Sequence, residues 1–226
     1  MAHQLADESA AGALDSTAPE DHPDDSAAQA DRPVGQAASR GLALLLTIGG
    51  VIGFAAAFVL LIERIQLLID PLYIPSCSLN DVLSCGSVMT TPQAAAFGFP
   101  NPIIGVAAFP VVATIGAAAL AGARFRRWFW LGLQAGTVFG VVFVHWLMFA
   151  SLFEIRALCP YCMVVWAVML PIFWYTTVAN IRAGRLPLGA VGRALVDYRH
   201  VVMLTWSLVI VALVIQSFWS YWVSLF

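Results

Sequence analysis

The stretch CPYCMVVWAVMLPIFWYTTV, residues 159–178, joins a pair of cysteines to a long uncharged segment. Pro160 suits the first position of a helix, where its missing N–H costs nothing, and Cys159 then takes the N-cap position. Both sulfurs would lie at the positive end of the helix dipole, which stabilises a thiolate. The Cys-x-x-Cys pair is therefore predisposed to thiol–disulfide exchange.

The same stretch is long enough to cross a hydrocarbon core of about 30 Å at about 1.5 Å per residue. Comparable uncharged runs occur at residues 41–62, 103–122, 129–153 and 201–224. Hydrophobic residues make up 61% of the chain and charged residues only 11%, against about a quarter charged in soluble domains. The sequence thus predicts an all-α integral membrane protein with five transmembrane helices and excludes a water-soluble fold. The net charge of −2 gives no indication of nucleic-acid binding.

Arginine predicts the orientation of these spans, because short cytoplasmic loops are enriched in basic residues. Arg64 and Arg156 alone fall on one face of the membrane; the other face carries Arg40, Arg124, Arg126, Arg127, Arg182, Arg185, Arg193 and Arg199. We therefore expect a cytoplasmic N-terminus, an outer C-terminus, and outer loops at 63–102 and 154–158. The predicted location is the inner (cytoplasmic) membrane, with the lipid bilayer as the solvent of residues 40–226.

Residues 1–39 are rich in acids, Ala, Ser and Pro and hold almost no large apolar side chains. Such a segment cannot bury enough surface to offset its ordering entropy. It also lacks the basic start and apolar core of a signal peptide. We predict a disordered, acidic cytoplasmic tail.

The remaining cysteines, Cys77 and Cys85, lie in the predicted outer loop 63–102. All four cysteines of the chain then face the oxidising side of the membrane, where disulfides form and persist. This arrangement favours a redox relay without a metal. Two alternatives stay open: a zinc site, which needs four suitable ligands, and a static disulfide that closes the loop. The loop's spacing of apolar residues predicts a short interfacial helix.

Asn101 and His145 are two further candidate residues. Asn101 precedes Pro102, so its backbone is expected to be extended and its side chain to cap the second span; the alternative is an amide that donates to a quinone carbonyl. His145 is ionisable within a span, which marks a functional site by default. Its alternatives are proton donation to a quinone and hydrogen-bonded packing. Small-residue faces for helix packing are expected at Gly49, Gly50, Gly116, Gly122, Gly132, Gly136 and Gly140.

Three motifs in this order resemble the vitamin K epoxide reductase family. They are the pair Cys77 and Cys85 with seven residues between them, the entry Asn101-Pro-Ile-Ile-Gly105, and Cys159-Pro-Tyr-Cys162 at the outer end of a span. The resemblance covers roughly residues 41–180. It implies a four-helix bundle around a quinone pocket, capped by the cysteine-bearing loop, with the fifth span outside it.

The resemblance also implies a role for each cysteine. Cys162 would pass electrons to the quinone, and Cys159 would be its exchange partner. Cys85 would attack the Cys159–Cys162 disulfide through a mixed Cys85–Cys159 intermediate, and Cys77 would exchange with a protein substrate.

Two non-cysteine contacts to the quinone follow from the same resemblance. Asn101 matches the quinone-contacting Asn of the family. Trp166 stands four residues after Cys162, where the family often has an aromatic hydrogen-bonder. Its indole offers an N–H but no hydroxyl. Menaquinone and ubiquinone fit equally well as the acceptor.

The expected protein partner is a separate, exported thioredoxin-fold oxidase of the DsbA-like type. Bacterial relatives often carry a thioredoxin-like domain after the fifth span, and this chain stops at Phe226. Such a partner is a strong oxidant, so only a better acceptor such as a membrane quinone can reoxidise it. The predicted function is a thiol:quinone oxidoreductase that supports disulfide-bond formation. The alternatives are a thiol carrier running in the reductant direction and a non-enzymatic scaffold with two static disulfides.

Overall fold

Helices make up all the regular structure that the computed structural model describes, which covers residues 35–80, 82–219 and 223. Five helices are long and apolar enough to cross a membrane. They are α2 (Arg40–Ile69), α4 (Pro102–Leu120), α5 (Arg127–Phe149) with its π-helical continuation η2 (Ala150–Ile155), α6 (Pro160–Arg182) and α8 (Arg199–Ser217). The predicted all-α membrane fold with five spans is confirmed.

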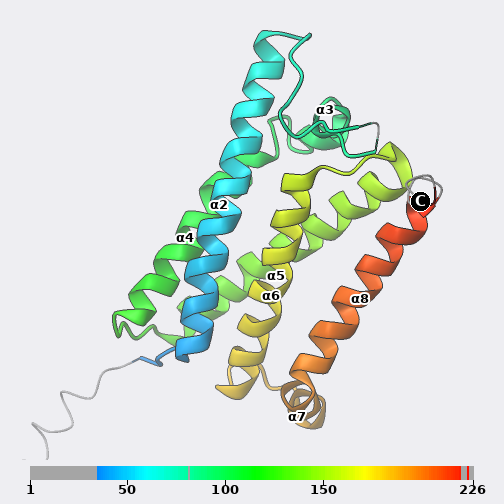
Figure 1. Ribbon diagram of the computed structural model, residues 1–226. Coiled ribbons are helices and arrows are strands. Elements are labelled where there is room, and N and C mark those ends of the chain that lie inside the picture. Colours follow the sequence, from blue (N-terminus) through cyan, green and yellow to red (C-terminus); the bar gives the residue numbers. More distant parts are fainter. Residues whose placement is uncertain (1–34, 81, 220–222, 224–226) are drawn as a thin grey trace, which may run out of the picture. The chain divides into compact units, whose positions relative to one another are not determined.

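Three short helices lie between these spans: α3 (Cys85–Met89), η1 (Pro92–Ala95) and α7 (Gly189–Asp197). Helices α3 and η1 belong to the cysteine-bearing loop, and α7 precedes α8 at the opposite end of the spans (Figure 1). The short helix expected in the loop is therefore present, but it begins only at Cys85.

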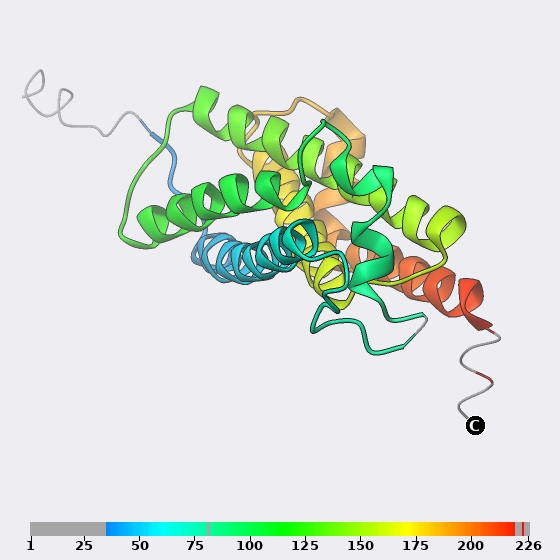
Figure 2. The ribbon, with the colours of Figure 1, turned by 90° about the horizontal axis from the view of Figure 1, so that it is seen from above.

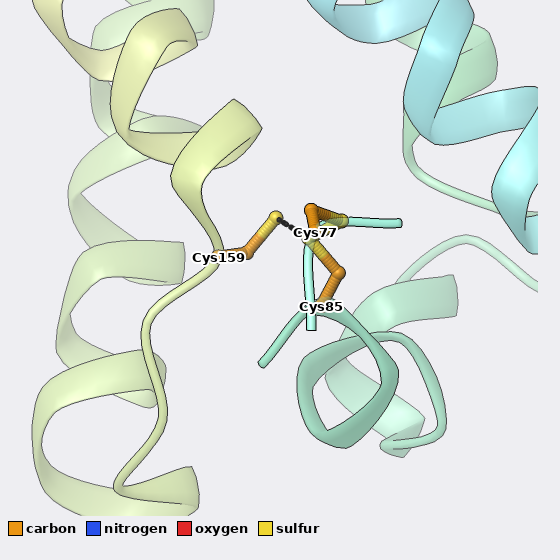
Figure 3. A group of neighbouring side chains, drawn as sticks. All are labelled: Cys77, Cys85 and Cys159. Carbon is orange, nitrogen blue, oxygen red and sulfur yellow. Dashed lines mark hydrogen bonds between the residues drawn. A yellow bond between two sulfur atoms is a disulfide. The ribbon is translucent and has the colours of Figure 1, made fainter. Parts of the chain in front are cut away.

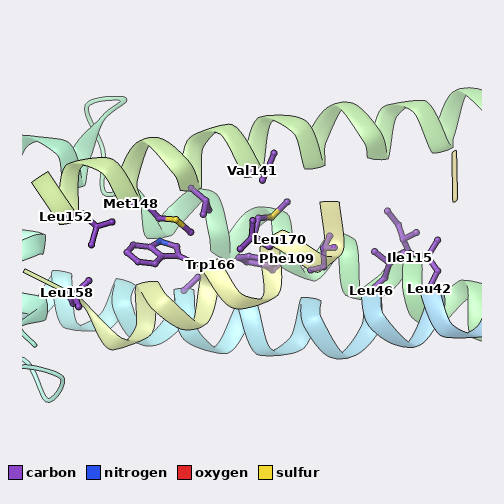
Figure 4. Packing of buried hydrophobic residues seen from close by; sticks show 14 of the residues in the cluster. Leu42, Leu46, Phe109, Ile115, Val141, Met148, Leu152, Leu158, Trp166 and Leu170 are labelled. Carbon is purple, nitrogen blue, oxygen red and sulfur yellow. The ribbon is translucent and has the colours of Figure 1, made fainter. Parts of the chain in front are cut away.

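Helices α2, α4, α5 and α6 form the bundle, in which α2 packs against α4 and α6, and α5 packs against α6. Their inward side chains form one apolar core, part of which Figure 4 shows. Helix α8 lies at the edge of the group, and none of its side chains is buried (Figure 2). The fifth span is thus an addition to a four-helix bundle, as predicted.

Glycines allow α2 and α4 to pack closely. A Cβ on Gly50 would lie 2.6 Å from the backbone nitrogen of Ala113, and one on Gly116 would lie 2.5 Å from that of Thr47. Close backbone contact of this kind is typical of membrane helices. The hydrophobic effect does not drive their association in lipid, so they rely on van der Waals packing, which small residues permit. The packing role predicted for Gly50 and Gly116 is confirmed.

For three other glycines the packing prediction is wrong. A Cβ on Gly132 or Gly136 would meet no atom within 4 Å, because both residues border a cavity. Gly122 has a φ of +93° and forms the turn after α4, with open space around it. The glycines of the spans therefore have two different roles: Gly50 and Gly116 allow helices to pack closely, whereas Gly132 and Gly136 line a cavity.

Two predicted boundaries need correction. Helix α2 continues to Ile69, so the cysteine-bearing loop comprises residues 70–101 and not 63–102. Gln36, predicted to be in the disordered tail, exchanges backbone hydrogen bonds of 3.0 and 3.3 Å with Phe125. Its carbonyl also accepts from the Trp130 indole at 3.4 Å, so paired backbone groups hold this part of the predicted tail. Residues 1–34 lie outside the described residues.

Candidate redox site

The two loop cysteines are joined to each other. Cys77 and Cys85 form a disulfide with a Cα–Cα distance of 5.6 Å. Cys85 is the first residue of α3, whose N-cap Ser84 accepts a hydrogen bond of 3.2 Å from the Ser87 backbone. Both cysteines are buried. The pair therefore forms a fixed unit on top of the bundle.

Cys159 and Cys162 open helix α6 as the sequence predicts. Cys159 is the N-cap, Pro160 follows at the first helical position, and the Cys162 N–H donates to the Cys159 sulfur at 3.4 Å. Both thiols are free. The N-terminus of the helix thus presents a sulfur where an anion is stabilised.

Backbone pairing brings the two cysteine pairs together. Leu83 and Leu158 form a parallel bridge. In it the Ser84 N–H donates to the Leu158 carbonyl at 2.9 Å, and the Leu158 N–H donates to the Val82 carbonyl at 2.7 Å. Cys159 comes one residue after this bridge and Cys85 two residues after it. The loop is therefore held in register with the segment that enters α6.

The consequence is a direct contact between the pairs. The Cys85 and Cys159 sulfurs lie 3.0 Å apart, and Figure 3 shows the Cys159 side chain pointing at the Cys77–Cys85 unit. The sulfurs of Cys77, Cys85 and Cys159 all lie within 4.8 Å of one another. A free thiol next to a disulfide is the arrangement that thiol–disulfide exchange requires.

The sulfur cluster does not suit zinc in this form. Metal binding needs deprotonated thiols, and Cys77 and Cys85 are consumed in their disulfide. Structural zinc also takes four ligands, whereas the cluster found among the described residues has three members.

The environment of Cys159 favours its thiolate. A hydrogen bond from the Cys162 side chain lowers the pKa of Cys159, and the backbone N–H groups of Cys162 and Tyr161 act in the same direction against the opposing effect of burial. A lower pKa raises the thiolate fraction and makes Cys159 a better leaving group.

A cavity of about 520 Å³ lies inside the bundle, below the cysteines. Its walls come from α4, α5, α6 and the loop before α4 and are almost entirely apolar. Cys162 is among the lining residues and Cys159 is not. A volume of this size is typical of a site for a drug-sized ligand. The two cysteines of the motif therefore face different neighbours: the loop disulfide and the cavity.

Asn101 lines the cavity, but its predicted extended backbone and capping role are wrong. Its φ of −54° and ψ of −34° are helical, and its side chain makes no cap hydrogen bond. The amide instead forms two hydrogen bonds with the backbone of the preceding loop. Its Nδ2 donates to the Gln93 carbonyl at 2.7 Å, and its Oδ1 accepts from the Ala96 N–H at 3.0 Å. These bonds offset the usual bias of a residue before proline. One amide N–H stays available.

Trp166 also lines the cavity and is only 5% exposed. Its indole N–H has no acceptor among the residues that the structure describes. A buried tryptophan N–H normally finds a partner. The side chain thus offers an unused donor beside the cavity.

His145 lies away from the cavity. Its Nδ1 lies 2.8 Å from the Val141 carbonyl, and its Nε2 is 3.1 Å from the Trp206 indole nitrogen. Because the indole donates, Nε2 is the acceptor and Nδ1–H donates to the carbonyl. Both ring nitrogens are therefore used: Nδ1 bonds within α5, and Nε2 joins α5 to α8. The residue of this stretch that lines the cavity is its neighbour Val144. This geometry favours the packing interpretation of His145 over a ligand role.

Sequence reasoning missed one positioning residue, Glu63. It is 6% exposed, and its carboxylate accepts hydrogen bonds from the Tyr73 hydroxyl at 2.9 Å, the Ser76 N–H at 3.3 Å and the Ser76 hydroxyl. The bond to this carboxylate raises the pKa of Tyr73. Ser76 precedes Cys77, so Glu63 anchors the start of the disulfide loop to α2. An acid at the end of an apolar run gives no sequence signal of such a contact.

The Cys162 hydrogen bond to Cys159 predicts a difference between two variants. In Cys162→Ser the hydroxyl can still donate to the Cys159 thiolate, whereas Cys162→Ala removes the donor. We expect the thiolate absorbance of Cys159 to appear at lower pH in the serine variant. Peptide mass mapping should first show that Cys77–Cys85 is intact in both. Identical titration curves would contradict a side-chain contribution from Cys162.

Comparison with known proteins agrees with this site. The model of the vitamin K epoxide reductase family matches residues 44–177, more than half of the chain. No curated protein sequence matches. The matched segment runs from α2 into α6 and contains all four cysteines and the two cavity-lining residues Asn101 and Trp166. The chain therefore belongs to the vitamin K epoxide reductase family.

Proposed function

We propose that the chain takes two electrons from an exported, DsbA-like thioredoxin-fold protein and passes them to a membrane quinone, menaquinone or ubiquinone. Membership of the family makes the chain a redox enzyme that acts on thiols and quinones. The electron path and the protein partner are the proposed part. The observation that carries the path is the 3.0 Å separation of the Cys85 and Cys159 sulfurs.

The first half of the path lies in the loop. A partner thiolate attacks the Cys77 sulfur, and Cys85 leaves as a thiolate. This leaves a mixed disulfide between the partner and Cys77. The partner's second thiol then attacks the partner sulfur of that bond, which closes the partner's own disulfide and releases Cys77 as a thiol. The partner leaves oxidised, and its two electrons reside on Cys77 and Cys85. Both sulfurs are buried in this state, and Cys77 is the less buried of the two, with 5% exposure against 0% for Cys85.

The second half crosses the contact between the pairs. The Cys85 thiolate attacks the Cys159 sulfur of a Cys159–Cys162 disulfide, and Cys162 leaves as a thiolate. Cys77 then attacks Cys85, which restores the Cys77–Cys85 disulfide and releases Cys159. The lowered pKa of Cys159 favours this departure. The arrangement with Cys77–Cys85 bonded and the other two thiols free corresponds to the end of this step.

The cavity supports the last transfer. A quinone in it accepts two electrons and two protons. Cys162 borders this space, so the pair Cys159–Cys162 can close its disulfide next to an acceptor. The free N–H of Trp166 and the remaining N–H of Asn101 are donors of the kind that a quinone carbonyl needs. The apolar walls keep water away from the transfer.

The charge pattern supports the orientation with the cysteines outside. The helix ends opposite the cysteines carry most of the described arginines, and of those only Arg64 and Arg156 lie near the cysteine end. The positive-inside rule then assigns the arginine-rich end to the cytoplasm. A purely structural scaffold would need neither the sulfur contact nor Cys162 at a cavity.

Quinone turnover tests the function. Purified protein in detergent, given a reduced thioredoxin-fold protein and a soluble quinone, should reduce the quinone. Cys159→Ala and Cys162→Ala should abolish this reduction, because each removes one half of the transferring pair. Met163→Ala is the matched control, since Met163 adjoins Cys162 but does not line the cavity. Full turnover in either cysteine variant, with folding intact, would sink the proposal and favour static disulfides.

Disulfide trapping tests the path. The double variant Cys77→Ala, Cys162→Ala leaves Cys85 and Cys159, which should join on mild oxidation because their sulfurs already touch. The variant Cys77→Ala, Cys159→Ala leaves Cys85 and Cys162, and these should stay free because Cys162 is outside the sulfur cluster. Peptide mass mapping distinguishes the two. Equal cross-linking in both variants would contradict transfer through Cys159.

Trp166 gives a separate test of the quinone site. Trp166→Phe keeps a large apolar ring but loses the N–H donor. A neutral hydrogen bond contributes a net of about 0.5–1.5 kcal/mol, so kcat/KM for the quinone should fall about three- to tenfold while the rate of Cys77–Cys85 reduction by the partner is unchanged. Trp166→Tyr, which restores a donor, should recover part of the loss. An unchanged kcat/KM would mean that the indole does not contact the quinone.

A further inference from the structure

A second cavity, of about 600 Å³, lies at the end of the bundle opposite the cysteines. Its lining residues come from the start of α2 and the residues before it, the end of α6 and the loop after it, and the start of α8, with Trp130 from α5. Figure 1 shows the start of α2, the end of α6 and the start of α8 at the end of the bundle opposite α3. Three arginines line it, Arg182, Arg185 and Arg199, together with apolar side chains such as Leu42 and Val178. The proposed redox chemistry makes no use of this space.

Arg185 is a buried cation that has no carboxylate partner among the residues that the structure describes. It is 5% exposed, its Nη1 donates to the Asn180 amide oxygen at 2.9 Å, and its guanidinium lies 4.8 Å from the centre of the Trp130 ring. Its Nε is buried with no hydrogen-bond partner. Burial lowers the pKa of this guanidinium. A buried charge is normally paired, so the side chain is incomplete as it stands.

The other groups at this cavity are also positive and uncompensated. The Arg182 guanidinium has no hydrogen-bond partner within the described ranges, and Arg199 donates only to the Val196 carbonyl at 3.1 Å. The N-terminus of α2 opens here with no acid in its first turn. A helix N-terminus favours an anion. Three guanidinium groups and one helix N-terminus thus border the same space.

Carboxylates do not neutralise these groups within the part of the chain that the structure describes. Glu63, Asp70 and Glu154 lie at the cysteine end, and Asp197 is the one described acid at the arginine end. None of these four acids, Asp197 included, lines the cavity. The missing anion must come from outside the described residues.

We propose that this cavity binds the phosphate group of an anionic phospholipid. The cavity lies where three membrane-length helices begin or end, which is the depth of lipid headgroups. Arginine forks match phosphate oxygens, and the adjoining apolar side chains suit the start of an acyl chain. Basic pockets between transmembrane helices are a recurring form of headgroup site.

Lipid retention on the full chain tests this site. Wild-type protein in a non-ionic detergent is mixed with dioctanoyl phosphatidylglycerol, and bound lipid is counted by native mass spectrometry. Arg182→Gln is the main variant, because this exposed side chain has no partner to lose. Its affinity for the lipid should fall about fivefold, the effect of one basic residue near a lipid surface. Arg193→Gln removes one charge at the same end, outside the cavity, and should leave binding unchanged.

Two further probes separate the sources of phosphate. Inorganic phosphate carries the charge without the chains, and dioctanoyl phosphatidylcholine carries the chains without the net charge. Weak binding of both supports a site for anionic lipid. Competition by inorganic phosphate at the lipid's own concentration would assign the cavity to free phosphate and overturn the proposal. Equal losses in Arg182→Gln and Arg193→Gln, or equal binding of the zwitterionic lipid, would overturn it too.

Discussion

Two backbone hydrogen bonds between the loop and Leu158, the residue before Cys159, place the two cysteine pairs next to each other. They pair Ser84 with Leu158 and Leu158 with Val82. Because Cys85 and Cys159 each follow the bridge by one residue or two, the register fixes which two of the four sulfurs meet. A shift by one residue would turn the side chains to opposite sides. The sulfur contact is therefore set by main-chain pairing and not by the side chains themselves.

The Cys-x-x-Cys spacing determines where the sulfurs of Cys159 and Cys162 lie relative to the loop and the cavity. In a helix that begins at Pro160, the N-cap sulfur of Cys159 stays outside the first turn, where it meets the loop. Cys162 is already inside that turn and borders the cavity. The same short motif thus faces a disulfide on one side and an apolar space on the other.

The sequence was sufficient for features that depend on local chemistry. The five spans follow from apolar runs, and the helix start at Cys159 follows from Pro160. Features that depend on pairing between distant segments could not be predicted. Asn101 was expected to cap its helix, but the loop before it supplied better partners at Gln93 and Ala96. His145 and Glu63 similarly depend on partners, Trp206 and Ser76, that no spacing rule reveals.

The two ends of the bundle each bury one charged side chain, the carboxylate of Glu63 at the cysteine end and the guanidinium of Arg185 at the other. At the cysteine end the buried carboxylate of Glu63 is satisfied by hydroxyl and N–H donors of the loop, so no cation is needed beside the thiols. A cation there would stabilise every nearby thiolate and weaken the difference between Cys159 and its neighbours. At the arginine end the guanidinium of Arg185 contacts an amide and an aromatic ring and keeps an unused N–H, but no described carboxylate contacts it. The Glu63 carboxylate is thus satisfied by its own loop, whereas the Arg185 guanidinium has no carboxylate partner among the described residues.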